Sequence, residues 1–317
     1  MKKIALLICL ISFVFAATAI EPVKRAKVDA AILDMAIADG KVYLATDASE
    51  VVIADTNLTI LNRIKVRKIK DFMGTLNNAD IYSVDVLGKK VLYLAQAEGG
   101  YAELFVYENG KSTKVLDKSL MLYAKAAKFV DSKRAIIALM SDEVILYDIA
   151  GKKILKRVKA GEYFYSCMAI EKGRKYVAIG DEGGEVIVVD TQTLQRVKLF
   201  KDVNKDKILS IYINRNLIAA GSRADKTLAL YSLDGSRPKV YKNPDFFIYV
   251  VGLSPDNHYV VFGDNEKYIL KVADTNSLDI RYKLIGHKNL VNVVRFLDAN
   301  SLLTGSETGE LIKWRLK

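Results

Sequence analysis

Residues 284–317 read LIGHKNLVNVVRFLDANSLLTGSETGELIKWRLK. A Gly-His pair opens the stretch, an alternating apolar run follows from Val291, and TGS at 304–306 leads through Gly309 to Trp314. Apolar residues at every second position predict short strands, and Gly and polar clusters between them predict tight turns. The stretch therefore predicts a small antiparallel β unit, and we asked whether the rest of the chain repeats it.

Related segments recur along the whole chain. Six earlier "apolar pair, then polar" sites align with the residue after Trp314, namely Asp55, Tyr107, Asp148, Asp190, Ser232 and Asp274. Successive spacings, ending at Arg315, are 52, 41, 42, 42, 42 and 41 residues. Self-similarity at such a period is typical of repeat architectures. The spacing predicts seven copies of one unit.

Each copy contains four short strands. The fourth runs SCMAI, YVAIG, VIVVD and RVKLF, separated by the turns EKGRK and DEGGE and by TQTLQ. A four-stranded unit of this size cannot cover its own faces, so the copies must stack around an axis. The sequence predicts an all-β fold, a seven-bladed β-propeller of four-stranded antiparallel blades. Residues 111–130 also fit helical spacing, but the repeat favours strands there.

The last copy resembles a WD40 repeat. The matching residues are Gly286 and His287, the V-x-x-V-x-F run from Val291, TGS at 304–306 and Trp314. The resemblance implies a buried hydrogen-bonded set of His287, Thr304 and Trp314, with Thr308 at the position where the family usually has Asp. It also implies a structural His287 rather than a catalytic or metal-binding one.

The N-terminus has the features of a cleaved signal peptide. Lys2 and Lys3 precede an apolar run, and the small residues 17–19 follow it. The run is shorter than the roughly 20 residues of a membrane-spanning helix. We expect cleavage after residue 19, a periplasmic location and a single propeller over residues 20–317. Cleavage lowers the formal net charge from +11 to +9 and leaves Cys167 as the only cysteine, so no internal disulfide is expected.

The two ends of the mature chain are complementary. The seventh copy stops at Lys317 without a fourth strand, and residues 22–27 (PVKRAK) precede the first copy with no local partner. We predict that the N-terminal segment supplies the outer strand of the last blade and closes the ring.

Few residues are suited to catalysis or cofactor binding. After the leader the chain has only His258, His287 and Cys167, which excludes a His/Cys zinc set or a Cys-x-x-Cys-His haem site. It also lacks a Gly-rich phosphate loop and a G-x-S-x-G elbow. We expect no catalytic residue, no cofactor and no metal. The alternative is a funnel enzyme with carboxylate-bound Ca²⁺, for which Asp34, Asp80, Asp85 and Asp206 are the candidates.

Positive charge is spread along the predicted outer strands, where Lys deters edge-to-edge pairing. Lys and Arg number 48 against 37 Asp and Glu. Nucleic acid is a poor partner for an exported protein without a base-stacking module. The charge favours an acidic protein partner or peripheral attraction to an anionic membrane, and we expect a monomer.

Two features predict a binding surface. The first spacing is about ten residues longer than the others, and the surplus carries Arg67, Lys68 and Lys70 beside Phe72 and Met73. Aromatic residues also stand where inner strands begin, and equivalent positions of successive blades converge on one face. About half of these rings should be core, and the rest should form an interface. These aromatic candidates are Tyr82, Tyr123, Tyr163, Tyr165, Phe246, Phe247 and Tyr249.

These features together predict an exported, non-enzymatic protein-binding scaffold. In length, leader and degenerate repeats the chain resembles the WD40-like accessory proteins of the periplasmic nitrate reductase system. That resemblance implies an assembly factor for a reductase that contains molybdenum and haem, while this chain binds neither. A further alternative is an outer-membrane-assembly scaffold that receives a partner strand or loop.

Overall fold

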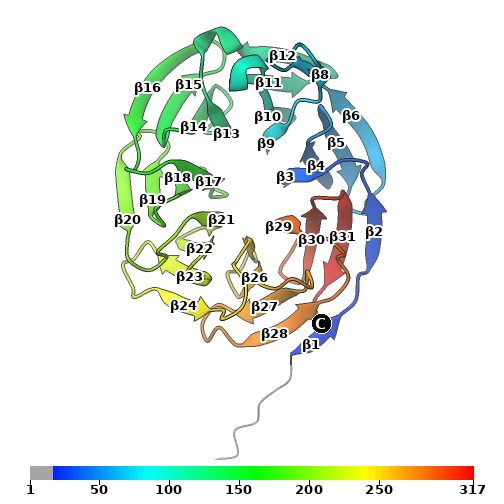
Figure 1. The fold of residues 1–317 in the computed structure, drawn as a ribbon, viewed down its shortest axis with the longest axis vertical. Coiled ribbons are helices and arrows are strands. Elements are labelled where there is room, and N and C mark those ends of the chain that lie inside the picture. Colours follow the sequence, from blue (N-terminus) through cyan, green and yellow to red (C-terminus); the bar gives the residue numbers. More distant parts are fainter. Residues whose placement is uncertain (1–16) are drawn as a thin grey trace, which may run out of the picture.

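The computed structural model describes residues 17–317 as a closed ring of seven blades, each a four-stranded antiparallel unit (Figure 1). The fold class predicted from the repeat spacing is therefore confirmed. Most of the predicted signal peptide lies outside the described residues. Within the described part, no helix is long and apolar enough to cross a membrane.

The strands follow the chain from the innermost to the outermost position of each blade. Blade 1 is β3 (Ile32–Ala38), β4 (Lys41–Thr46), β5 (Glu50–Asp55) and β6 (Ile60–Lys65); blade 2 is β9 (Ile81–Leu87), β10 (Lys90–Gln96), β11 (Ala102–Glu108) and β12 (Lys111–Leu116); blade 3 is β13 (Ala124–Phe129), β14 (Arg134–Leu139), β15 (Glu143–Asp148) and β16 (Lys153–Lys159). Residues 111–130 thus form strands, as the repeat predicts, with only the short 3₁₀ turn η2 (Lys118–Leu120) between them.

The second half of the ring repeats this order. Blade 4 is β17 (Tyr165–Ile170), β18 (Tyr176–Asp181), β19 (Val186–Asp190) and β20 (Arg196–Phe200); blade 5 is β21 (Ile208–Asn214), β22 (Leu217–Ser222), β23 (Thr227–Ser232) and β24 (Lys239–Lys242); blade 6 is β25 (Val250–Leu253), β26 (Tyr259–Gly263), β27 (Leu270–Asp274) and β28 (Ile280–Leu284); blade 7 is β29 (Val291–Phe296), β30 (Ser301–Ser306) and β31 (Glu310–Arg315), completed by β2 (Lys24–Lys27).

The core lies between blades. Residues 17–317 contain seven clusters of buried apolar side chains, and each cluster joins two neighbouring blades. Middle strands are covered on both faces, so β10 buries five consecutive residues, Val91 to Ala95. This explains the near-continuous apolar runs of the second and third strands, because burial on both faces removes the need for polar alternation.

The N-terminal segment closes the ring, as predicted. β2 pairs antiparallel with β31, from Lys24 opposite Lys313 to Lys27 opposite Glu310, and the two strands lie side by side in Figure 1. Val23 N–H and Val28 N–H extend the pairing with 2.8 Å hydrogen bonds to backbone oxygens of blade 7. A second N-terminal strand, β1 (Thr18–Ile20), was not predicted. It pairs in parallel with β28 of blade 6. The expected cleavage site falls inside β1.

The predicted buried set of the last blade is present. His287 Nε2 lies 2.6 Å from Thr304 Oγ1, and Trp314 Nε1–H donates to the same oxygen at 2.8 Å. The acidic partner is Glu310, whose Oε2 lies 3.4 Å from His287 Nδ1, while Thr308 is exposed. Burial lowers the pKa of His287 to about 4, so the ring is neutral at neutral pH and acts as a hydrogen-bonding core residue.

Candidate functional site

The two faces of the propeller differ in their connections. Strand direction alternates within a blade, so connections between blades and turns between second and third strands emerge on one face, which we call the loop face. The remaining two turns of each blade emerge on the opposite face, which we call the turn face. The long insertion forms a hairpin of β7 (Ile69–Lys70) and β8 (Leu76–Asn77) between β6 and β9, and therefore lies on the loop face.

Exposed apolar side chains gather on the loop face. Apart from those on or directly beside the outermost strands, all large exposed hydrophobic residues of the described chain belong to loop-face connections. Phe72 is 97% exposed, which is close to complete exposure for a residue that is normally buried. We call this set the apolar patch; it comprises Phe72, Met73, Leu76, Leu120, Met121, Tyr123, Met140, Tyr163 and Phe164.

Contacts between neighbouring loops hold members of the patch near one another. The Tyr123 ring packs 4.9 Å from that of Tyr101 in blade 2, Met140 N–H donates to Tyr123 O at 2.9 Å, and Tyr165 N–H donates to Met140 O at 3.1 Å. The hairpin is tied to blade 2 by Arg67, whose guanidinium lies 3.6 Å from a Glu103 carboxylate oxygen. The patch therefore extends over blades 2 to 4.

A glycine permits the position of Tyr163. A Cβ on Gly183 would lie 2.2 Å from the Tyr163 ring, so any other residue there would displace the ring. The ring rests on the backbone of the turn between β18 and β19 and remains 52% exposed. This arrangement holds an aromatic side chain at the surface instead of in the core.

The predicted aromatic residues separate into three groups. Tyr123 and Tyr163 are in the apolar patch, while Tyr82 and Tyr165 are half-buried and line the central channel. Phe246 and Phe247 are half-buried with ring centroids 4.0 Å apart, and both pack edge-on against Tyr249. Tyr249 is only 7% exposed and fits over Gly263, so it is a core residue rather than a contact for a partner.

The basic candidates Arg67, Lys68 and Lys70 are all exposed: the first two lie in the segment that precedes β7, and Lys70 is on β7, two residues before Phe72. Sequence reasoning missed several apolar members of the patch, above all Met121 and Met140. The available signal was an apolar residue inside a short turn, where polar residues are the rule. Met140, in the turn between β14 and β15, fits that description.

The central channel has two chambers. They meet at a waist where Asp34 of blade 1 binds Lys128 of blade 3 at 2.7 Å and Arg295 of blade 7 at 2.9 Å. Lys128 and Arg295 line both chambers. Burial opposes ionisation of Asp34, but the two cations outweigh it and lower the pKa of this carboxyl.

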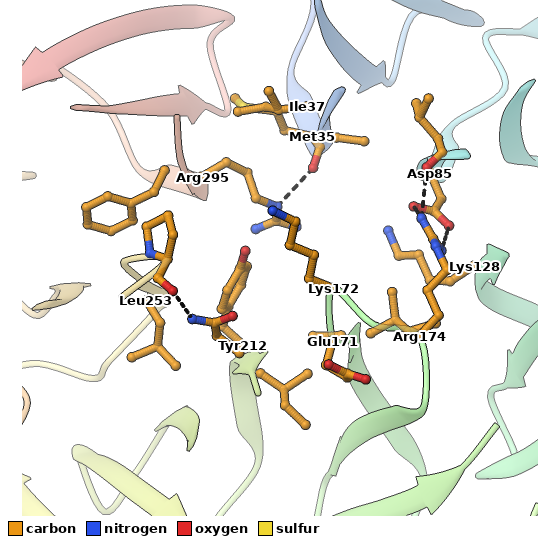
Figure 2. Close-up of a pocket in the computed structure, with 18 of the residues that line it drawn as sticks. Met35, Ile37, Asp85, Lys128, Glu171, Lys172, Arg174, Tyr212, Leu253 and Arg295 are labelled. Atoms are coloured by element: carbon orange, nitrogen blue, oxygen red, sulfur yellow. Dashed lines mark hydrogen bonds and ion pairs between the residues drawn. The ribbon is translucent and has the colours of Figure 1, made fainter. Parts of the chain in front are cut away.

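The turn-face chamber has a volume of about 330 Å³ and is shown in Figure 2. Arg174, from the first turn of blade 4, reaches Asp85 of blade 2 with contacts of 2.6 and 3.1 Å. It also donates to the backbone oxygens of Phe129 and Val86 at 2.8 Å. Arg174 therefore fastens blade 4 to blades 2 and 3 across this end of the channel.

The candidates for a carboxylate-bound Ca²⁺ are dispersed. Asp34 and Asp85 are engaged by basic side chains, Asp206 pairs with Arg223 at 3.0 Å, and burial raises the pKa of Asp80. Within residues 17–317, no three His, Cys, Asp or Glu side chains are grouped to hold a metal ion. The structure thus does not bring the four acids together.

Beneath the loop face, between blades 3 and 4, lie three buried acids. Asp142 is 1% exposed with neither carboxylate oxygen hydrogen-bonded, and one oxygen each of Asp181 and Glu185 also lacks a partner. Burial and the neighbouring Asp181 raise the pKa of Asp142 to about 7, and burial raises that of Asp181 to about 6. The two carboxyls flank Gly161, where a Cβ would lie 2.5 Å from Asp142 Oδ2 and 3.3 Å from Asp181 Oδ2.

Comparison with protein-family models and with curated proteins found no match to this chain.

Proposed function

We propose that this protein is an exported, non-enzymatic scaffold that binds a protein partner through the apolar patch of its loop face. The exposure of Phe72, Met73, Tyr163 and Phe164, each above half, is the observation that carries this proposal. Contiguous exposed apolar surface with a polar rim is typical of interaction sites. Aromatic and Met side chains are also the ones enriched at interfaces.

The scaffold suits this role physically. Each blade is held by core on both sides, so the loops that carry the patch project from a rigid ring. A preorganised surface loses little conformational entropy on binding, which favours affinity. Arg67, Lys68 and Lys70 beside the patch favour a partner with an acidic surface.

The finer proposal concerns the partner. We propose that it is a subunit of a periplasmic respiratory reductase, as in the nitrate reductase system, and that the chain assists its assembly. The support is the N-terminal leader pattern and the resemblance, in length and degenerate repeats, to WD40-like accessory proteins. The buried set of His287, Thr304 and Trp314 supports the WD40-type blade alone.

Site-specific photo-crosslinking in intact cells tests both the docking surface and the identity of the partner. A photoreactive amino acid at Phe72 should give a specific adduct, and mass spectrometry should identify a reductase subunit in it. The matched control is Leu155 on β16, an apolar residue 46% exposed on the outermost strand of blade 3. Equal adducts at both positions, or none at Phe72, would contradict the loop-face proposal. An adduct of unrelated identity would overturn only the reductase assignment.

A further inference from the structure

The loop-face chamber of the channel opens beside the apolar patch. It has a volume of about 450 Å³, and Met140 belongs both to its lining and to the patch. Tyr82 and Tyr165 form part of its wall, and the waist of Asp34, Lys128 and Arg295 forms its floor. A partner seated on the patch is therefore adjacent to the mouth of this chamber.

Basic side chains outnumber acidic ones in the chamber. The charged lining residues are Lys125, Lys128, Lys207, Arg295, Asp34 and Glu182. Lys128 and Arg295 share the single carboxylate of Asp34, and Lys207 pairs with Glu182 at 2.9 Å. The chamber therefore has an excess of two positive charges.

Lys125 is the cation without an acidic partner. No carboxylate oxygen of the described residues lies within ion-pair distance of its Nζ, which instead stands 4.5 Å above the centre of the Tyr82 ring. Lys125 is half-buried at the start of β13, and Asp80, the acid whose pKa its charge lowers, lies beyond ion-pair distance. Its three N–H donors are suited to an incoming carboxylate.

We propose that the loop-face chamber receives an acidic segment of the protein partner, with Lys125 as its main contact. This inference rests on the proposed function and specifies the chemistry of the partner. Low-dielectric walls concentrate the field of like charges in a cleft, which attracts ligands of opposite sign. The waist limits the segment to this half of the channel, and the exposed hairpin residues Lys68 and Lys70 extend the positive field outward.

The test uses a fluorescein-labelled hexaglutamate peptide and the mature protein, with binding followed by fluorescence anisotropy at low salt. Lys125→Gln should weaken binding at least about tenfold, as expected for loss of a charged hydrogen bond. The matched control is Lys172→Gln, which removes one charge from the turn-face chamber and should change affinity less than about twofold for a distant exposed charge. A hexaglutamine peptide should not bind.

Each alternative outcome is decisive. Equal losses in Lys125→Gln and Lys172→Gln would indicate general attraction to a basic protein, and would overturn the proposal. Competition by free glutarate at concentrations equal in carboxylate would indicate a small-molecule anion site, and would also overturn it. If the hexaglutamate peptide does not bind while the Phe72 crosslink still forms, the chamber proposal is wrong and the docking proposal stands. Melting curves of both variants confirm that each is folded.

Discussion

The turn face and the loop face are formed by the ends of the same strands but carry different kinds of connection. On the turn face, aspartates close the tight turns: Asp190 Oδ1 accepts backbone hydrogen bonds from Gln192 at 3.0 Å and Thr193 at 2.9 Å, and Asp274 Oδ1 accepts from Asn276 at 2.7 Å. The loop face instead carries the inserted hairpin and the apolar patch. Aspartates also close turns on the loop face, where Asp71 Oδ1 accepts from the backbone N–H groups of Met73 and Thr75 at 2.9 Å. The difference is that the loop face adds large exposed apolar side chains away from the outermost strands.

Two aspartates, one from each face, differ in their surroundings. Burial opposes ionisation of Asp190, but hydrogen bonds from Thr193 and Gln192 outweigh it and lower the pKa of that carboxyl. For Asp142 beneath the loop face, burial and the neighbouring Asp181 outweigh the interaction with the nearby Gly161 N–H and raise the pKa of that carboxyl. Unsatisfied buried groups are costly and are rarely kept for stability alone. On our proposal, the turn face supports the fold and the loop face binds the partner.

The largest expected effect tests whether both faces depend on one closed ring. Deleting residues 20–27 removes β2 and its pairing with β31, which exposes an edge of blade 7. We expect the Tm, measured by circular dichroism, to fall by about 10 °C or more, equivalent to several kcal/mol in a chain of this size. Replacing hairpin residues 69–77 with a short Gly-Ser linker is the control and should change the Tm little. Equal Tm values for wild type and the 20–27 deletion would contradict closure by β2.

The second prediction separates two aromatic pairs on the loop face. Phe246→Ala with Phe247→Ala should destabilise the fold by about 2–4 kcal/mol, because both rings pack against the core at Tyr249. Tyr163→Ala with Phe164→Ala should leave the Tm nearly unchanged but weaken the partner complex by about 2 kcal/mol, as expected of a hot-spot pair. Titration calorimetry and melting curves measure the two effects. A lower Tm for the Tyr163→Ala with Phe164→Ala variant would indicate that these two rings contribute to the core.

The third prediction concerns pH and stability. The native pKa of Asp142 is raised to about 7, so the native state keeps a proton that the unfolded chain releases. This contribution to stability is complete below about pH 4 and is lost as the pH rises toward 7. Asp142→Asn removes the titrating charge at a positive-φ position that Asn tolerates. Its Tm should exceed that of wild type at pH 8, and the difference should shrink toward pH 4.

A matched control for the pH effect lies on the turn face. The pKa of Asp190 is lowered, so its stabilising contribution is present at neutral pH and is lost as the pH falls. Asp190→Asn should therefore have a lower Tm than wild type at pH 8, the opposite sign to Asp142→Asn. The same sign for both variants would remove the electrostatic distinction between the faces.

Repeat spacing was sufficient to predict the blades, because each copy encodes the same local alternation and the same turns. Closure was predictable for a similar reason, since PVKRAK had no partner and the seventh copy lacked a strand. The buried set of His287, Thr304 and Trp314 was found through a motif. The role of Glu310 was not found, because the pairing register of β31 decides which acidic side chain lies beside the imidazole of His287.

The site was less accessible to sequence reasoning. Asp34, Lys128 and Arg295 come from blades 1, 3 and 7, and only the closed ring brings them together. The exposure of the aromatic side chains could not be predicted either. Tyr163 and Tyr249 both lie in connections between blades, yet Tyr163 lies on Gly183 at the surface and Tyr249 is buried over Gly263. Such differences depend on a neighbouring turn or strand end, which a single segment does not specify.

The smallest expected effect concerns the charges of the hairpin. Replacing Arg67, Lys68 and Lys70 with Ser should slow association with the partner at low salt by about tenfold and leave dissociation nearly unchanged, because exposed charges act mainly by steering. The effect should disappear as salt rises and screening shortens the range of the field. The fold should survive, since Glu103 keeps its 2.7 Å contact with Lys114 when Arg67 is removed.

The matched control removes the same charge from the other side of the molecule. Lys111, Lys152 and Lys172 are exposed at or beside turns of the turn face, and their triple Ser variant has an identical net charge to the hairpin variant. Stopped-flow measurements should show a slower association for the hairpin variant than for the control. If the two variants associate equally slowly, net charge rather than its position governs encounter, and the loop face loses its electrostatic distinction.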